Sequence, residues 1–372
     1  MRARLDAVKF RLKLAPLAPF TAGSGRLLGR FDYVLTVNPR TGSPLIRLID
    51  IEKFIEESPL PAQKKVEAIE ARSASVLERF SRCVLACGFR RVMDGLDLVE
   101  FHRGSDGQPI VPASSIKGML RTAVGFARAR REPARLRDGV EAAMEGRWRR
   151  EGAAQRLERI LFGPHAEIDD LRSLLVGEAA PATNGDMKAF EASVLTLSGP
   201  SLRPRGPLFV EALGPETGKS FEFPVAIDRA LRRPLEERSG PAASGEPAKD
   251  PDRSLDGREG LLEALRGLSE AVIEGEKRFY GDLGERDLAR LLSETLRRAD
   301  GRIALPFGAG SGWRSKTLGA LLGPAELQRL APLLSPGRNY YRVHGRPVFP
   351  KSRRWILDGG RPARPLGWVT VE

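Results

Sequence analysis

Residues 109–131 read PIVPASSIKGMLRTAVGFARARR, a short apolar strand that runs through a small-residue turn into a helical pattern. Apolar side chains follow the turn at the three- and four-residue spacing of one helix face, and they are Ile116, Met119, Leu120, Ala123, Val124 and Ala127. A strand that leads directly into such a helix is typical of proteins that mix sheets and helices. The stretch therefore predicts a helix with one buried stripe.

Basic residues mark the edge of this stripe. At 100° per residue, Lys117, Arg121 and Arg128 lie within about 40° of one another. Ser114 and Ser115 stand at the start of the helix, where either hydroxyl can act as a cap. Free backbone N–H groups with early basic side chains suit a phosphate, so Ser114, Ser115, Lys117 and Arg121 are candidate phosphate ligands. A core helix with a solvated basic edge is an equal alternative.

Strands and helices alternate along the rest of the chain. Residues 8–14 show period two, with lysine and arginine on the outer face, and predict a half-buried strand. FDYVLTV and PLIRLI flank the turn NPRTGS and predict a hairpin, after which Asp50 is expected to cap a short helix. Residues 62–88 read as helical, and PLFVEAL with SFEFPVAI predicts a further hairpin about GPETGK.

The interleaved pattern predicts an α+β protein of two domains, because 372 residues exceed what one core usually organises. We expect an N-terminal domain over 1–183 and a C-terminal domain over 184–372. Residues 233–259 are rich in proline, glycine, serine and charge, and they predict a mobile loop within the second domain.

The net charge of +13 favours a nucleic-acid partner, because basic residues that neutralise phosphates release counterions. No apolar run approaches the roughly 18 to 20 residues that span a bilayer, so we expect a cytoplasmic protein without a membrane partner. Cys83 and Cys87, at i, i+4 on the predicted helix, are expected to be buried free thiols. A two-ligand metal site is the less favoured alternative, because further ligands are missing nearby.

The segment LPFGAGSGWRSKTLGALL, residues 305–322, nearly matches the Walker A template of nucleotide-binding proteins. Ser315 stands where the template needs glycine, and no strand ending in a magnesium-binding aspartate is evident, which disfavours an ATPase. Glycines here still allow a close backbone approach to a ligand, and Trp313 could stack on a base. The candidate binding residues are Gly308, Gly310, Ser311, Gly312, Trp313, Arg314 and Lys316. A tight turn with a core tryptophan is the alternative.

Catalytic patterns are sparse. His102, His165 and His344 stand in unrelated contexts, and Asp169-Asp170 reads as the solvated start of a helix. We therefore expect no catalytic residues, no metal and no cofactor, and a non-enzymatic role.

Three segments together resemble the RAMP proteins, the repeat-associated subunits of CRISPR effector complexes. PIVPASSIKGMLRTAV is similar to their strand, turn and basic helix, and residues 305–322 to their C-terminal glycine-rich loop. The ending FPKSRRWILDGGRPARPLGWVTVE resembles that of the fifth-subunit family of the type III-A Csm complex. Phe20-Thr21 departs from the polar pair that many relatives have before the first glycine loop.

The resemblance implies two ferredoxin-like (RRM-like) domains with helical insertions and a C-terminal glycine-rich loop. It also implies a subunit that binds CRISPR RNA, caps the filament at the 3′ end of that RNA and assists its maturation. The implied partners are CRISPR RNA, the adjacent RAMP backbone subunit, the small subunit and recruited host nucleases. A RAMP endoribonuclease that processes CRISPR RNA is the alternative, although it usually needs a general base such as histidine.

Overall fold

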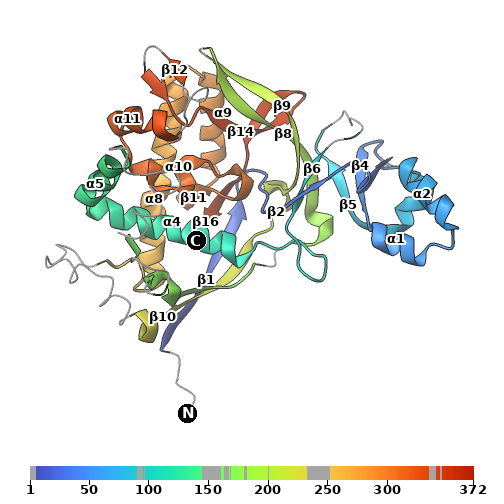
Figure 1. Cartoon of the computed structure of the whole chain (residues 1–372), viewed down its shortest axis with the longest axis horizontal. Helices are drawn as coiled ribbons and strands as arrows, with labels where there is room; N and C mark the ends of the chain where they lie inside the picture. The colour runs from blue at the N-terminus through green and yellow to red at the C-terminus, as the bar shows by residue number, and fades with distance from the viewer. Residues whose placement is uncertain are drawn as a thin grey trace.

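The computed structural model describes residues 6–89, 95, 97–144, 161–162, 167, 169–179, 182–199, 201–232, 252–334, 341–343 and 346–372. Within them, two large sheets form the framework, with a small β12-β13 ribbon beside them (Figure 1). One sheet has the strand order β11-β16-β1-β10-β7. The other has the order β2-β6-β9-β8-β5-β4-β3, with β14 and β15 attached through β8.

The strands of the five-stranded sheet are β1 (Ala7–Pro16), β7 (Leu174–Val176), β10 (Phe221–Asp228), β11 (Ile303–Pro306) and β16 (Trp368–Val371). Those of the larger sheet are β2 (Gly23–Leu28), β3 (Tyr33–Val37), β4 (Pro44–Ile49), β5 (Ser81–Cys87), β6 (Leu98–Phe101), β8 (Met187–Ser198), β9 (Ser201–Leu213), β14 (Ser352–Asp358) and β15 (Arg361–Pro365), and the ribbon joins β12 (Tyr341–Val343) to β13 (Arg346–Val348). The main helices are α1 (Ile51–Glu57), α2 (Ala62–Glu70), α3 (Ala74–Leu77), α4 (Ala113–Arg131), α5 (Pro133–Met144), α8 (Arg258–Asp282), α9 (Arg286–Arg297), α10 (Trp313–Lys316) and α11 (Pro324–Leu334).

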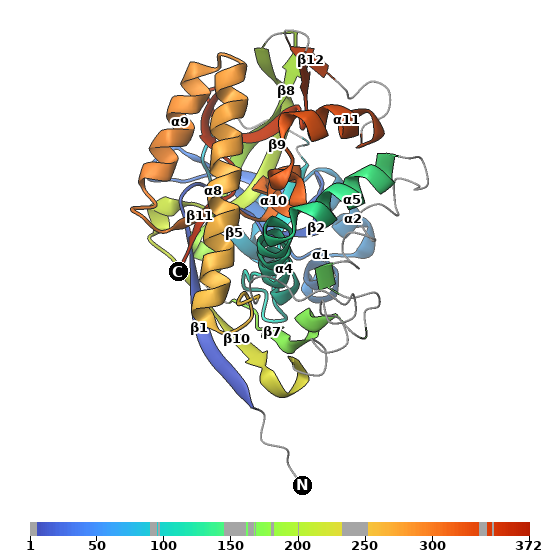
Figure 2. The same ribbon diagram turned by 90° about the vertical axis from the view of Figure 1, so that its left-hand side faces the viewer.

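Helices α4 and α8 pack against each other and against the five-stranded sheet, as Figure 2 shows. Leu12 and Leu14 of β1 belong to the hydrophobic core and are at most 1% exposed, whereas Lys9 and Arg11 of the same strand are exposed. The period-two prediction for this strand is confirmed. The α+β class is confirmed as well, and it arises because one face of a sheet needs helices to cover its apolar side chains.

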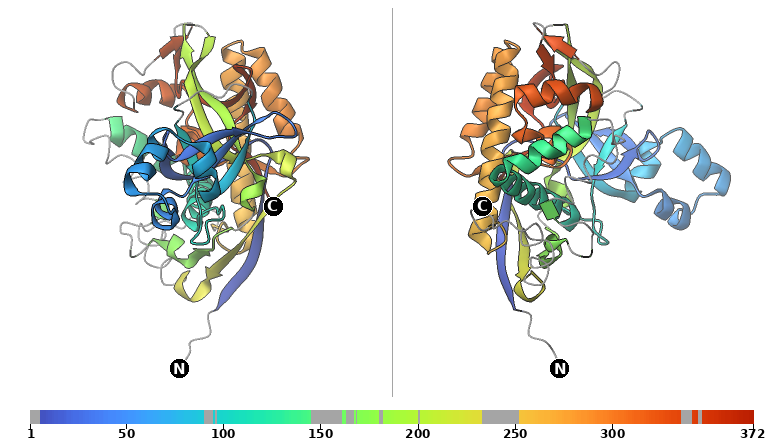
Figure 3. Two further views of the ribbon diagram at one scale, coloured as in Figure 1. Left: turned by 90° about the vertical axis from the view of Figure 1, so that its right-hand side faces the viewer. Right: turned by 60° about the vertical axis from the view of Figure 1, so that its left-hand side comes forward.

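Strands β3, β4 and β5 with helices α1 to α3 form a lobe that projects from the body (Figure 3). The predicted hairpin is present, with Tyr33 opposite Leu48. Asp50 caps α1 as predicted, because its carboxylate accepts a hydrogen bond from the backbone N–H of Lys53 at 2.9 Å. Phe54 is fully buried and anchors the small core of this lobe.

The helix predicted over 62–88 is wrong beyond Leu77. A short 3-10 turn at Glu78–Phe80 leads into strand β5, which contains both cysteines and pairs with β4 and β8. Residues four apart lie on the same face of a strand as well as of a helix, so the spacing of the two cysteines does not distinguish a strand from a helix. Cys83 is buried, Cys87 is partly buried, and both thiols are free. Burial raises the pKa of the Cys83 thiol to about 11 and that of Cys87 to about 12.

The hairpin predicted about GPETGK is also wrong. Strand β9 pairs with β8 and β6, while β10 pairs with β1 and β7 in the other sheet. A 3-10 turn at Pro215–Thr217 carries the chain from one sheet to the other. Strand β9 forms a hairpin with β8, the strand just before it, whereas the partners of β10 lie far away in the sequence, where a local turn signal gives no information.

The loop predicted over 233–259 lies outside the described residues as far as residue 251. From residue 252 the chain is fixed, because Leu255 is fully buried and α8 begins at Arg258. Strands from both sides of residue 183 occur in each large sheet. The division into domains at this point stays a prediction.

Candidate nucleic-acid interface

Helix α4 begins at Ala113, with Pro112 at the N-cap position and no side-chain cap. Ser114 and Ser115 lie inside the first turn and are exposed. The prediction that one of them caps the helix is therefore wrong, since a cap must precede the first helical residue. Their contact with a phosphate stays a prediction.

Two basic side chains of α4 already have internal partners. Lys117 donates from Nζ to the carbonyl oxygen of Leu174 at 2.7 Å, and Arg121 Nη1 lies 2.6 Å from Asp169 Oδ2. The Arg121 guanidinium also lies 4.1 Å from the centroid of the Phe162 ring. Burial lowers the pKa of Lys117. A phosphate at this edge would have to displace or share these contacts.

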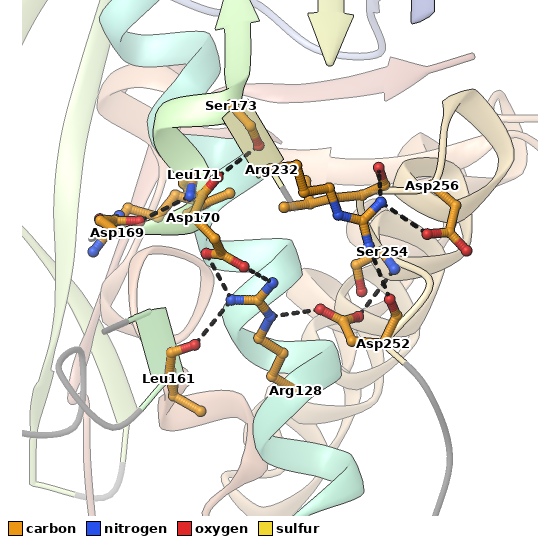
Figure 4. A network of polar contacts seen from close by, with 12 residues as sticks. Arg128, Leu161, Asp169, Asp170, Leu171, Ser173, Arg232, Asp252, Ser254 and Asp256 are labelled. Carbon is orange, nitrogen blue, oxygen red and sulfur yellow. Dashed lines mark hydrogen bonds and ion pairs between the residues drawn. The ribbon is translucent and has the colours of Figure 1, made fainter. Parts of the chain in front are cut away.

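Arg128, the third residue of this edge, lies at the centre of an internal network (Figure 4). Its guanidinium binds both carboxylate oxygens of Asp170, and its Nε donates to Asp252 Oδ2 at 2.6 Å. The carbonyl oxygen of Leu161 accepts a further bond at 2.9 Å. Burial by itself lowers the pKa of Arg128, but the hydrogen bonds and charges of the two carboxylates raise it overall. We define Lys117, Arg121 and Arg128 as the α4 basic edge.

The glycines of residues 305–322 serve close contacts within the chain. Gly308 has φ of +61°, and a Cβ there would overlap the carbonyl oxygen of Thr21. A Cβ on Gly310 would overlap the carbonyl oxygen of Leu366. Only glycine fits where two backbones come this close. A Cβ on Gly312 would meet nothing within 4 Å, so close packing does not require glycine at that position.

The local structure differs from that of a nucleotide-binding P-loop. Ser315 is buried, and its hydroxyl accepts a hydrogen bond from the backbone N–H of Gly312 at 3.1 Å. Helix α10 ends at Lys316 after four residues, so the long helix expected after a Walker A loop does not follow. Ser311 donates from its hydroxyl to the carbonyl oxygen of Pro306 at 3.2 Å.

Trp313 packs within the protein. Its ring covers Gly319, where a Cβ would overlap it, and meets Phe349 edge to face with ring centroids 4.9 Å apart. The indole is partly exposed. The stacking of a base on Trp313 stays a prediction.

The two predicted segments lie against each other in the fold. A Cβ on Gly125, in the middle of α4, would lie 3.6 Å from the side chain of Leu318 in the glycine-rich loop. The arrangement leaves Lys316 exposed beside Arg354 of β14. Partial burial, followed by the positive charge of Arg354, lowers the pKa of Lys316.

The register of strands β14, β8 and β9 places two further basic side chains near Lys316 and Arg354. Arg354 lies opposite Val194 of β8, which lies opposite Arg205 of β9, so the three side chains share one face. Two residues along, Arg203 belongs to the same face. We define Lys316, Arg354, Arg205 and Arg203 as the basic face.

All four residues of the basic face are exposed, and none forms an ion pair with a residue in the described ranges. Arg354 donates a hydrogen bond from Nη1 to the carbonyl oxygen of Ala309, which fixes it against the glycine-rich loop. Sequence reasoning missed three of these four residues. The segments SLRPRGP and KSRRW carry the signal as clustered basic residues, but only the pairing of both strands with β8 brings them together.

Among the described residues, no group of three histidine, cysteine, aspartate or glutamate side chains could hold a metal ion. None of the helices that the structure describes combines the length and apolar character needed to cross a membrane.

Comparison with known proteins places this geometry in context. Residues 17–315 match the model of the RAMP superfamily. No curated protein matches the chain. A chain from a cryo-EM structure of a Csm–crRNA–target RNA ternary complex in a type III-A CRISPR-Cas system is similar over 97% of this chain and 99% of its own, with 22% identity and a TM-score of 0.70. The crystal structure of Csm5 from T. onnurineus is similar over 96% of this chain and 99% of its own, with 20% identity and a TM-score of 0.66.

Proposed function

This chain belongs to the RAMP superfamily, and from that premise we propose that it is a non-catalytic, RNA-binding subunit of a type III-A CRISPR effector complex. In this role it binds CRISPR RNA, contacts the adjacent RAMP backbone subunit and the small subunit, and works in the cytoplasm. It caps the filament at the 3′ end of the RNA and assists maturation by recruited nucleases. Support comes from the similar chain in a complex that contains crRNA and target RNA, and from the C-terminal resemblance.

The basic face is the observation that carries the RNA-binding proposal. None of its four basic side chains forms an ion pair with a described carboxylate, and burial, followed by the charge of the neighbouring Arg354, lowers the pKa of Lys316. Like charges that lie together on a surface repel each other, and a polyanion relieves the repulsion. Neighbouring strands lie about 4.8 Å apart, so Arg354 and Arg205 are separated by about 10 Å along a strip. This strip follows a nucleic-acid backbone, with affinity from phosphates and little dependence on sequence.

The salt dependence of RNA binding tests this proposal. Each phosphate contact contributes about 0.7 to the slope of log affinity against log salt for a single strand, so Lys316→Ala with Arg354→Ala lowers the slope by about 1.4. The matched control is Lys64→Ala with Arg258→Ala, which removes the same charge from two exposed residues paired elsewhere with Glu67 and Glu259. An unchanged slope and affinity in the first variant contradicts the proposal.

The same purified protein also tests the alternative function, an endoribonuclease. The four residues of the basic face include no general base of the usual kind, such as histidine or a carboxylate. We expect binding without cleavage. RNA cleavage that follows the protein through successive purification steps, and is lost when one of its own side chains is replaced, establishes the enzyme instead.

A further inference from the structure

A pocket of about 300 Å³ lies beneath the glycine-rich loop, between helix α8 and strand β14. Its lining includes Glu276 and Tyr280 from α8, Gly312 and Arg314 from the loop and α10, and Arg353 from β14. This volume is at the lower end of the range of small-ligand sites, about 300 to 1,000 Å³. The pocket extends inward from the basic face, because Arg354 and Val194 also line it.

Arg314 has no hydrogen bond or ion pair with any described residue, although its Nε is buried. The side chain lies across Gly275 of α8, with Nη1 3.1 Å from the position of a Cβ there, so the missing side chain makes room for it. Burial, followed by the charge of Arg353, lowers the pKa of Arg314. An unpaired buried guanidinium is costly, and such a group points to an ion or ligand that completes it.

Arg353 presents a second incomplete donor in the same pocket. Its Nε lies 2.5 Å from Glu276 Oε2, and its Nη1 donates to the carbonyl oxygens of Pro350 at 3.0 Å and Ser352 at 2.9 Å. The guanidinium stacks 3.7 Å from the centroid of the Phe279 ring. These contacts hold the group rigidly, yet its Nη2 is buried without a partner. A fixed guanidinium with a spare donor suits a tetrahedral oxyanion.

The charges of the pocket define the ligand. Among the described residues that line it, Arg314, Arg353 and Arg354 are basic and Glu276 is acidic. Three positive charges against one negative charge leave an excess of two. A phosphomonoester carries about −1.5 to −2 at neutral pH, whereas a phosphodiester of an internal RNA linkage carries −1.

We infer that this pocket binds one phosphomonoester group, that of a free nucleotide or of a phosphorylated RNA end. Arg314 and Arg353 donate to its oxygens, and Arg354 lies at the entrance. The inference goes beyond the proposed function, because it concerns a site for a terminal phosphate and not the path of the RNA backbone. It can fail while the basic face still binds RNA.

Thermal unfolding of the full chain tests the site with AMP, adenosine and inorganic phosphate at matched ionic strength. A ligand of the folded state raises the unfolding midpoint as its concentration rises. Hydrogen bonds between charged groups are worth about 1.5 to 3 kcal/mol, or roughly tenfold or more in affinity. We expect saturable stabilisation by AMP and phosphate, with AMP at least about tenfold tighter than adenosine. Equal responses to AMP and adenosine overturn the inference.

Arg314→Met separates a binding role from a structural one. Because the guanidinium has no hydrogen-bond or ion-pair partner among the described residues, its removal leaves the unfolding midpoint without ligand unchanged or higher, and it abolishes the response to AMP and phosphate. The control is Arg290→Met on α9, an exposed arginine paired with Glu294, which keeps the response. A response that persists in Arg314→Met, or a lower midpoint without ligand, overturns the assignment.

RNA oligonucleotides identify the source of the phosphate. Tighter binding of a strand with a terminal phosphate than of the same strand with a terminal hydroxyl, lost in Arg314→Met, assigns the pocket to an RNA end. Equal binding of the two strands, with AMP still bound, assigns it to a free nucleotide. A response to N-acetylglutamate as strong as that to AMP assigns it to a protein carboxylate and overturns the inference. For the strand with a terminal hydroxyl, Arg314→Met is expected to keep the salt slope of RNA binding, so failure here leaves the proposed function intact.

Discussion

Helix α4 and the β14-β8-β9 surface both carry a row of basic side chains, yet these rows have different surroundings. On the α4 basic edge, Arg121 pairs with Asp169, and Arg128 pairs with Asp170 and Asp252. On the basic face, Lys316, Arg354, Arg205 and Arg203 have no such partners among the described residues. Positive charge in a sequence therefore indicates a ligand only after the carboxylates that meet it in the fold are known.

The largest expected effect concerns the paired region. Arg128→Met leaves the carboxylate of Asp170 buried without its cation, since that side chain is 5% exposed. Breaking one side of a buried ion pair costs about 3 to 5 kcal/mol. We expect a loss of this size in the free energy of unfolding, measured by urea denaturation. Arg131→Met, which removes a more exposed partner of Asp252, is the control and costs under about 1 kcal/mol. Equal effects of the two variants contradict the network's role.

Acid should weaken the same network. Asp252 is part-buried, and although its burial alone raises its pKa, the charge of Arg128 and hydrogen bonds lower the pKa to about 2. A carboxylate with a depressed pKa stabilises the fold above its unfolded value near 4 and loses that contribution as the pH falls toward 2. We expect the free energy of unfolding to drop by roughly 2 kcal/mol across this window. In Asp252→Asn, the free energy of unfolding should fall less over this pH range. A fall as large as that of the parent protein would show that Asp252 does not cause it.

The glycine-rich loop distinguishes contacts within the chain from an open surface. Gly310→Ala places a Cβ against the carbonyl oxygen of Leu366 and should cost about 1 to 3 kcal/mol of unfolding free energy. Gly312→Ala meets nothing within 4 Å and should cost less than about 0.5 kcal/mol. Differential scanning calorimetry of both variants checks this order. The reverse order contradicts the assignment of Gly310 to internal packing.

Much of this architecture follows from local patterns in the sequence. The alternation of β1, the hairpin around NPRTGS, the Asp50 cap and the buried stripe of α4 depend on neighbours along the chain. Strand β5 was mistaken for a helix because Cys83 and Cys87 lie four apart, a spacing that both structures place on one face. The switch of β10 to the other sheet depends on its pairing with β1, more than two hundred residues away.

The candidate site was predictable only in part. The glycine-rich loop and Lys316 were evident, because glycines and a near-match to Walker A stand together in the sequence. Arg205 and Arg354 were not, since they lie on opposite sides of β8 and meet through strand register. The internal partners of α4 were equally hidden, because Asp169, Asp170 and Asp252 come from other segments. Asp169 and Asp170 were expected to be solvated, but Asp170 is buried.

The most direct test compares the two regions in one experiment, the binding of single-stranded RNA over a range of salt concentrations. Lys316→Ala with Arg354→Ala should lower the slope of log affinity against log salt by about 1.4. Lys117→Ala with Arg121→Ala removes the same charge from the paired region and should leave the slope unchanged. A slope that falls for Lys117→Ala with Arg121→Ala but stays constant for Lys316→Ala with Arg354→Ala would contradict the account. It would instead place the RNA-binding site at the start of α4.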